Sequence, residues 1–372
     1  MSKIDKNLLS ILFSDRRFDG GIVRSLENQD KALALVRVRN PLQIIALERR
    51  FSVKKEYPFI RSLAIECGLE DAIKLERMAE VEYVSANSRV ACLAEDIKPK
   101  SADSVYAFNS SSKLTGNGVT LCVMDTGVAL HSDLSIPKER IVHFVDVING
   151  EKEPYDDNGH GTLVAGIAAG NGLLSAKRVS GVAPMANVVG LKAIAKNGES
   201  GTFNILDGMQ WLFDNFRQYG IKVVCMSFGA EPLEYADPLK IGAEMLARSG
   251  LIVVVASGNS GENNLKSPAI SDEIISVGAV NEQGEIADFT SRGVYNGVKR
   301  PDIYAKGVNV QGIKTGGTYA TMTGTSASAP YVAGACCLLC EKYKNLTPRQ
   351  AKTMIVSSSK NIDGNLVFEL DV

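Results

Sequence analysis

The sequence lacks any long hydrophobic run. Its apolar stretches, such as residues 251–256, fall far short of the roughly 18 residues that a membrane-spanning helix needs. The first 20 residues carry charges throughout and contain no apolar core of the ~7–15 residues typical of a secretory signal. We therefore predict neither a membrane segment nor a signal peptide.

An excess of charge of one sign is also missing. Lys and Arg number 41 against 42 Asp and Glu, which gives a net charge of −1 and no hint of nucleic acid or an anionic membrane as partner. Hydrophobic residues make up 45% and charged residues 22% of the chain, as in an ordinary globular protein. Its 372 residues favour two domains.

Cysteine is present but not in a metal-binding or disulfide pattern. The number is odd, and no C-x-x-C pair is accompanied by partner histidines, so a zinc site is not expected. Reduced, buried thiols indicate a cytoplasmic protein, although a signal removed before this numbering would also fit. The cysteines are Cys67, Cys92, Cys122, Cys225, Cys336, Cys337 and Cys340.

Three distant segments carry the residues of a nucleophilic site. Asp125 lies in Val-Met-Asp-Thr-Gly-Val, His160 in Asn-Gly-His-Gly-Thr, and Ser326 in Gly-Thr-Ser-Ala-Ser-Ala-Pro. A serine hydroxyl needs a base to take its proton, and histidine suits this because its pKa lies near neutral. A buried carboxylate orients the imidazole. We predict Ser326 as nucleophile, His160 as base and then acid, and Asp125 as the orienting group.

A fourth polar residue follows a buried strand. The apolar run Leu251–Ala256 ends in Ser-Gly-Asn, which would deliver Asn259 to the carboxyl edge of a parallel sheet.

Each of these residues also has a structural interpretation. Asp125 and Asn259 could be turn residues, His160 could start a helix without a further role, and Ser326 could be a helix N-cap. The four together, each beside small residues, favour catalysis.

The chain beyond residue 113 alternates strands and helices, which is typical of an α/β fold with a parallel sheet covered on both faces. The expected strands are Val119–Met124, Asn187–Ala193, Lys222–Ser227, Leu251–Ala256 and Ile274–Val280. The expected helices are His160–Ala169, Asn204–Gln218, Glu234–Arg248, Ser326–Tyr343 and Pro348–Ser357.

The first 95 residues differ in pattern. We expect strands at Lys31–Arg39, Phe59–Glu66 and 81–84, with helices at Pro41–Arg50 and Leu69–Met78. This β-α-β-β-α-β-like order predicts a small α+β domain.

The order Asp, His, Ser within D-T-G, H-G-T and G-T-S-x-[SA]-x-P resembles the subtilisin-like serine peptidases (subtilases, family S8) from about Val105 to Ser357. The resemblance implies a serine endopeptidase that acts through an acyl-enzyme on a doubly wound parallel sheet. It also implies that Asn259 and the Ser326 backbone N–H stabilise the oxyanion. Peptides or proteins would be the substrates.

The N-terminal region looks like a subtilase propeptide with a ferredoxin-like fold. The resemblance then divides the chain into a propeptide-like domain (1–95), a linker with a processing site (96–112) and a peptidase domain (113–372). It implies a self-processing zymogen whose own N-terminal domain acts as intramolecular inhibitor, with the cut bond between Cys92 and Lys100, near Ala94. An unrelated small α+β domain is the alternative.

The resemblance also assigns a substrate-binding region. Residues 227–229 would form one wall of the S1 pocket and residues 256–258 the facing wall. Lys266 would lie at the floor, and Gly198–Gly201 would supply an edge strand. Lys266 would favour an acidic or polar P1 side chain, unless it points to solvent. The wall residues are Ser227, Phe228, Gly229, Ala256, Ser257 and Gly258.

No cofactor or metal is assigned. Asp133 matches a common calcium-ligand position of the family, but Lys177 and Arg178 in the expected companion loop oppose a cation, so structural calcium is disfavoured.

Two other functional classes fit the sequence less well. A catalytically silent binding protein on the same scaffold would have no reason to keep Asp125, His160, Ser326 and Asn259 together. A lipase or esterase of the α/β-hydrolase type needs G-x-S-x-G and the order Ser, Asp, His, which this sequence lacks.

Overall fold

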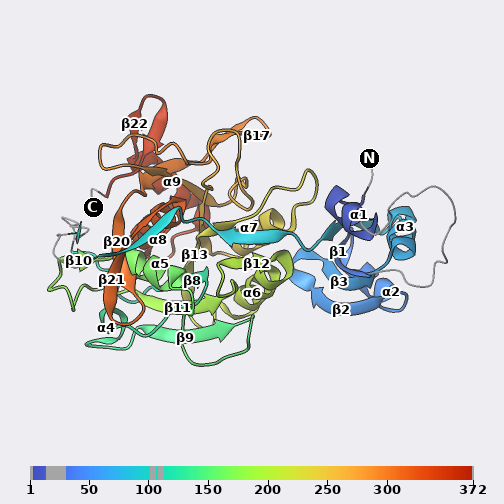
Figure 1. Ribbon diagram of the computed structural model, residues 1–372, viewed down its shortest axis with the longest axis horizontal. Coiled ribbons are helices and arrows are strands. Elements are labelled where there is room, and N and C mark those ends of the chain that lie inside the picture. Colours follow the sequence, from blue (N-terminus) through green and yellow to red (C-terminus); the bar gives the residue numbers. More distant parts are fainter. Residues whose placement is uncertain (1–2, 14–30, 101–105, 108–112, 371–372) are drawn as a thin grey trace.

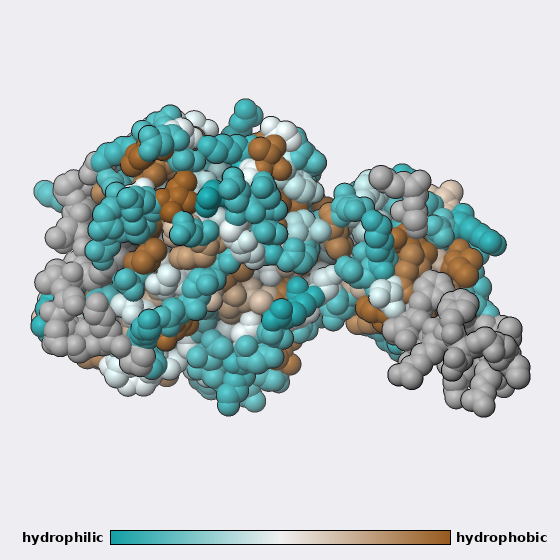
Figure 2. All heavy atoms as spheres, turned by 45° about the horizontal axis from the view of Figure 1, so that its top comes forward, coloured by the Kyte–Doolittle hydropathy of each residue, from teal (hydrophilic) through white to brown (hydrophobic). Residues whose placement is uncertain are grey.

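The computed structural model describes residues 3–13, 31–100, 106–107 and 113–370. Two bodies of unequal size lie side by side along the long axis of the molecule (Figure 1). A narrower waist joins them (Figure 2).

The smaller body is an α+β domain with a four-stranded antiparallel sheet of order β2-β3-β1-β4. From β1 to β4 the elements follow the expected β-α-β-β-α-β-like order, and α1 precedes them. Its elements are α1 (Lys6–Phe13), β1 (Ala32–Val38), α2 (Ile44–Glu48), β2 (Ser52–Tyr57), β3 (Ser62–Cys67), α3 (Leu69–Arg77) and β4 (Val81–Ala86). Sequence reasoning missed α1, and it missed β2 because that edge strand, Ser-Val-Lys-Lys-Glu-Tyr, exposes most of its side chains.

The larger body is built on a nine-stranded sheet of order β22-β23-β19-β16-β15-β13-β8-β11-β9. Every neighbouring pair except β22–β23 is parallel. The strands are β8 (Thr120–Asp125), β9 (Ile141–Asp146), β11 (Asn187–Lys192), β13 (Ile221–Met226), β15 (Ile252–Ala256), β16 (Ile275–Val280), β19 (Ile303–Lys306), β22 (Lys360–Ile362) and β23 (Asn365–Val367).

Helices cover both faces of this sheet. Leu121 and Val123 of β8 belong to one hydrophobic cluster, which also contains residues of α5 (His160–Ala169), α8 (Thr325–Lys342) and α9 (Pro348–Ser358). Cys122 and Met124 belong to the other, with α6 (Thr202–Asn215) and α7 (Pro238–Arg248). Because successive strand residues point to opposite faces, the central strands are apolar throughout, and the predicted α/β fold is confirmed.

Shorter elements surround the sheet. They are α4 (Ser132–Ser135), β7 (Tyr106–Ala107), β10 (Val179–Ser180), β12 (Glu199–Gly201), β14 (Phe228–Gly229), β17 (Gly293–Tyr295), β18 (Val298–Arg300), β20 (Val310–Lys314) and β21 (Thr318–Thr323). The smaller body contains two 3-10 turns, at Pro41–Gln43 and Pro58–Ile60.

The chain between the two bodies is ordered rather than a plain linker. Strand β5 (Arg89–Cys92) lies between β12 and β14, and β6 (Asp96–Lys100) pairs antiparallel with β21. In Figure 1 this segment runs in cyan from the smaller body across the larger one. The expectation of a linker from residue 96 is therefore wrong for Asp96–Lys100; residues 101–105 and 108–112 lie outside the described residues.

The smaller body also packs on α6 and α7. The rings of Phe59 and Phe213 lie 5.8 Å apart, and the Tyr57 hydroxyl donates to Asp207 Oδ1 at 2.8 Å. Tyr57 is almost fully buried, so the two bodies share an apolar contact with a specific polar bond.

Candidate active site

The carboxyl end of β8 and the start of α5 bring Asp125 to His160. Asp125 Oδ1 lies 2.7 Å from His160 Nδ1 and also accepts the Thr126 N–H at 2.7 Å. The helix can approach this closely because residue 161 is glycine: a Cβ there would lie 2.1 Å from the Gly127 carbonyl oxygen. The predicted pairing of these two distant residues is present.

Charge sets the protonation of His160. Burial by itself would lower the pKa of the imidazole, but the adjacent Asp125 carboxylate, with a further contribution from Cys92, raises that pKa well above its ordinary value of 6.5. The arrangement stabilises an imidazolium at Nδ1, as a base that must hold a proton requires.

Ser326 lies in the first turn of α8, directly after Gly324 and Thr325. Gly324 has a φ of 145°, which favours glycine. The Ser326 hydroxyl donates to the Ser227 carbonyl at 2.9 Å and accepts the Leu93 N–H at 3.1 Å. Within the described residues the buried His160 Nε2 has no hydrogen-bond partner, so in this arrangement the Ser326 hydroxyl does not bind the His160 ring.

The segment that contains Cys92 and Leu93, called the arm below, lies between His160 and Ser326. The Cys92 sulfur lies within 4.8 Å of an Asp125 oxygen and a His160 nitrogen, and the next residue, Leu93, binds the Ser326 hydroxyl. The histidine and the serine therefore flank the same short segment of backbone.

Two N–H donors converge on one carbonyl oxygen. Asn259 Nδ2 donates to the Leu93 oxygen at 2.6 Å, and the Ser326 backbone N–H donates to it at 3.1 Å. The Asn259 amide is oriented by its other end, where Oδ1 accepts the Thr325 N–H at 3.0 Å and the Thr325 hydroxyl at 2.8 Å. This pair of donors can stabilise a negative charge on the bound oxygen.

The arm lies in the site as an extended strand. Ala91 pairs with Glu199 on one side and with Gly229 on the other, so β5 is held between β12 and β14. Peptides bind many proteins in this manner, through main-chain hydrogen bonds to exposed strand edges. The glycine-rich segment expected to form an edge strand, 198–201, supplies β12.

The Leu93 side chain lies in a pocket whose lining includes one of the expected wall residues, Gly229. A Cβ on Gly229 would lie 3.2 Å from Leu93 Cδ1 and 2.8 Å from Lys266 Cβ, and one on Gly258 would lie 2.6 Å from Lys266 Cγ. The stem of Lys266 is thus a wall of this pocket. Its ammonium group forms an ion pair with Glu231, a residue that sequence reasoning missed.

Comparisons with known proteins place this chain in a family. The model of the Subtilase family (Peptidase_S8) matches residues 116–370. The chain belongs to the subtilases. This subtilase is therefore a hydrolase of the serine endopeptidase class, as the resemblance implied.

Curated relatives cover most of this subtilase. It is similar to the serine protease AprX of Bacillus subtilis (strain 168), with 32% identity over 87% of this chain and 80% of that protein. It is also similar to the alkaline protease of Shouchella clausii, with 32% identity over 90% of this chain and 83% of that protein.

Solved structures agree in fold. Fervidolysin from Fervidobacterium pennivorans superimposes with a TM-score of 0.72 at 22% identity, over 94% of this chain and 61% of that one. A cold-adapted subtilisin-like serine proteinase superimposes with a TM-score of 0.61 at 26% identity, over 73% of this chain and 96% of that one.

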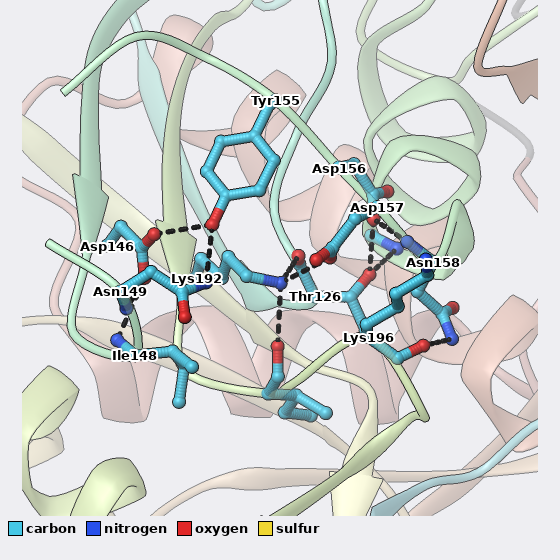
Figure 3. A network of polar contacts seen from close by, with 12 residues as sticks. Thr126, Asp146, Ile148, Asn149, Tyr155, Asp156, Asp157, Asn158, Lys192 and Lys196 are labelled. Carbon is cyan, nitrogen blue, oxygen red and sulfur yellow. Dashed lines mark hydrogen bonds and ion pairs between the residues drawn. The ribbon is translucent and has the colours of Figure 1, made fainter. Parts of the chain in front are cut away.

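A buried lysine that the sequence interpretation did not single out ties the site's loops together (Figure 3). Lys192 Nζ, at the end of β11, donates to the Thr126 carbonyl at 2.7 Å and the Ile194 carbonyl at 3.1 Å, and pairs with Asp157 at 2.7 Å. It therefore connects the residue after Asp125 with the loop before His160. Its charge at the end of an apolar strand was the available signal.

Asp156 secures the same loop. Its carboxylate accepts the Gly159 N–H at 2.8 Å and the Thr162 N–H at 2.9 Å, and the Thr126 hydroxyl donates to it at 2.9 Å. These bonds satisfy N–H groups at the start of α5 and fix the position of His160.

The surroundings of Asp133 do not fit a calcium ion. Asp133 is fully buried, and its two carboxylate oxygens accept the Leu174 N–H at 2.9 Å and the Tyr319 hydroxyl at 2.8 Å. Donors therefore occupy the oxygens that a cation would need.

Across the described ranges, no helix has the length and apolar character to cross a membrane.

Proposed function

We propose that this subtilase cleaves peptide bonds with Ser326 as nucleophile, His160 as base and acid, Asp125 as orienting carboxylate, and the Asn259 amide with the Ser326 N–H as oxyanion donors. The observation that carries the proposal is the position of Leu93. Its carbonyl oxygen accepts hydrogen bonds from the Asn259 amide and the Ser326 N–H, and its backbone N–H donates to the Ser326 hydroxyl. Leu93 thus occupies the place of the P1 residue, the one whose carbonyl is attacked.

The reaction follows from these positions. Ser326 Oγ rotates from the Ser227 carbonyl towards His160 Nε2, gives up its proton and attacks the carbonyl carbon. The carbonyl π electrons move to the oxygen between the two donors. When the tetrahedral intermediate collapses, the C–N bond breaks, and His160 gives its proton to the leaving amine. Water then hydrolyses the acyl-enzyme through the same steps.

The same position supports a zymogen. With Leu93 at P1, the bond to be cut is Leu93–Ala94, within the expected interval from Cys92 to Lys100. Residues before this bond would then act as a propeptide whose tail, β5, fills the substrate cleft after cleavage. The proposed domain boundary is then Leu93 rather than residue 95.

The cytoplasmic location stays a prediction. Its support is the set of seven free thiols, six of them buried. Cell fractionation with an antibody to the chain measures it directly.

Fluorophosphonate labelling tests the proposed nucleophile. The wild-type chain, Ser326→Ala and the control Ser357→Ala, an exposed helix position, are incubated with the probe and with a fluorogenic peptide carrying leucine at P1. Once the N-terminal domain has dissociated from the cleft, we expect labelling and peptide hydrolysis in the wild type and the control, and neither in Ser326→Ala. Equal hydrolysis by Ser326→Ala would refute the assignment, and a silent binding protein would show no reaction in any of the three.

A further inference from the structure

The P1 pocket contains a charge pair that bears on substrate choice. Leu93 is 9% exposed and packs with the hydrophobic cluster of the peptidase body. The pocket that holds it is apolar where the leucine lies, yet one wall is the stem of a lysine, Lys266. This inference rests on the proposed function, which places Leu93 at P1.

The position of Lys266 is fixed by backbone on both sides. Its N–H donates to the Ser257 carbonyl at 3.2 Å, and its Cβ and Cγ lie against Gly229 and Gly258. The side chain as a whole is only 11% exposed. A charge at the end of a side chain that is mostly buried is stabilised by a counter-ion.

Glu231 supplies that counter-ion from the opposite wall. Residues 230 and 267 exchange two backbone hydrogen bonds, Ala230 N–H to the Ser267 carbonyl at 3.0 Å and Ser267 N–H to the Ala230 carbonyl at 2.9 Å. This bridge places Glu231 beside Lys266 and lets its carboxylate bind Nζ. The Glu231 side chain is 78% exposed, so it can swing into solvent with little rearrangement.

We propose that Glu231 determines the P1 class of this subtilase by neutralising Lys266. With the pair intact the pocket is neutral and accepts an uncharged aliphatic side chain such as leucine. An acidic P1 side chain has to displace Glu231 from the ammonium. Without Glu231, the ammonium faces the pocket and selects an acidic P1 residue.

The chain's own tail offers a test in the full-length protein. Leu93→Glu is combined with wild-type Glu231 or with Glu231→Gln, and self-cleavage is followed by gel electrophoresis. We expect Leu93→Glu to slow processing, and Glu231→Gln to restore it by about five- to tenfold. Glu369→Gln, which removes the exposed partner of Lys360, is the matched control and should restore nothing.

A second measurement uses peptides that differ only at P1, with Leu, Glu or Arg. Glu231→Gln should raise the kcat/KM ratio of Glu over Leu by about five- to tenfold, and Lys266→Met should lower it while raising the ratio of Arg over Leu. If leucine peptides are cleaved normally and both ratios stay constant in both variants, the role of Glu231 is overturned and the proposed function stands. If no peptide is cleaved and no precursor is processed, both fall.

Discussion

Two acidic residues and a lysine determine how His160 is held. Asp125 binds Nδ1, Asp156 fixes the start of the helix that carries the histidine, and Lys192 joins the loops on either side. Each acts through atoms other than Nε2, which leaves that nitrogen free for the role of base that we propose for His160. These residues thus fix the orientation of the His160 ring without binding Nε2.

The raised pKa of His160 gives self-processing a defined pH dependence. The histidine must be neutral to accept a proton, so we expect the rate to rise with pH and to reach half its maximum above 6.5. In Asp125→Asn the midpoint should shift down, because the attraction that raises the pKa is lost, and the plateau rate should fall. Rates measured on gels from pH 5 to 10 test this; an unchanged midpoint in Asp125→Asn would show that the carboxylate is not the cause of the raised pKa.

The same shift has a consequence for stability. A pKa raised by folding adds stability that is fully present below the unfolded value of 6.5 and is lost as pH rises through the folded pKa. Unfolding of the inactive Ser326→Ala chain should therefore show this contribution decreasing above pH 6.5.

Replacing Lys192 by methionine removes the buried charge and leaves Asp157 and two carbonyls without their donor. Because Asp157 is 31% exposed, we expect a loss of about 2 kcal/mol in the free energy of unfolding rather than the larger cost of a fully buried pair. Urea unfolding in the Ser326→Ala background measures it, with the exposed Lys138→Met as control. Equal values for the two variants would show that Lys192 does not hold the loops.

At the scale of elements, the site depends on how closely α5 approaches β8. Helix α5 begins at His160 and strand β8 ends at Asp125, so their contact sets the distance between the two side chains. Gly161 is the residue that permits this contact.

Gly161→Ala should therefore separate the pair. We expect a loss of about 2–3 kcal/mol in stability and failure of self-processing, because the added methyl group meets backbone rather than a flexible side chain. Gly316→Ala is the comparison: it has a φ of 82° but nothing within 4 Å, so it should cost only about 1 kcal/mol and leave processing intact. Normal processing by Gly161→Ala would disprove the argument.

The sequence located strands β8, β11, β13, β15 and β16 of the peptidase body because these buried strands are continuous apolar runs with clear ends, and it located helices α5 to α9. It did not locate β9, β19 or most of the shorter elements around the sheet. Helix α5 was predicted to the residue, since small residues and His160 mark its start. Helix α7 begins later than expected, at Pro238, because Asp237 caps it through the Lys240 N–H. Strand β6 was missed because Asp-Ile-Lys-Pro-Lys reads as a polar linker, and only its pairing with β21 makes it a strand.

For the candidate site, the sequence predicted the residues that stand in motifs but not the residues that hold them in place. Asp125, His160, Ser326 and Asn259 stand in local motifs that a sequence displays directly. The roles of Lys192 and Glu231 depend on partners 35 residues away in each case, which no local pattern reveals. His131, which was not among the candidate site residues, is buried and caps α4 by accepting the Asp133 N–H.

At the scale of the whole molecule, one continuous segment of chain forms the smaller body and then runs through the cleft of the larger one. The α+β domain packs on α6 and α7, β5 occupies the cleft, and β6 adds to the sheet of β20 and β21. Cleavage at Leu93–Ala94 would separate these parts while leaving β6 with the peptidase body.

Intact mass spectrometry of the purified wild-type chain beside Ser326→Ala tests most directly whether Ser326 cuts the Leu93–Ala94 bond. We expect two wild-type products, one ending at Leu93 and one beginning at Ala94, and a single full-length mass for Ser326→Ala. A cut at another bond, or the same cut in Ser326→Ala, would contradict the role of Leu93 as the residue held for attack by Ser326.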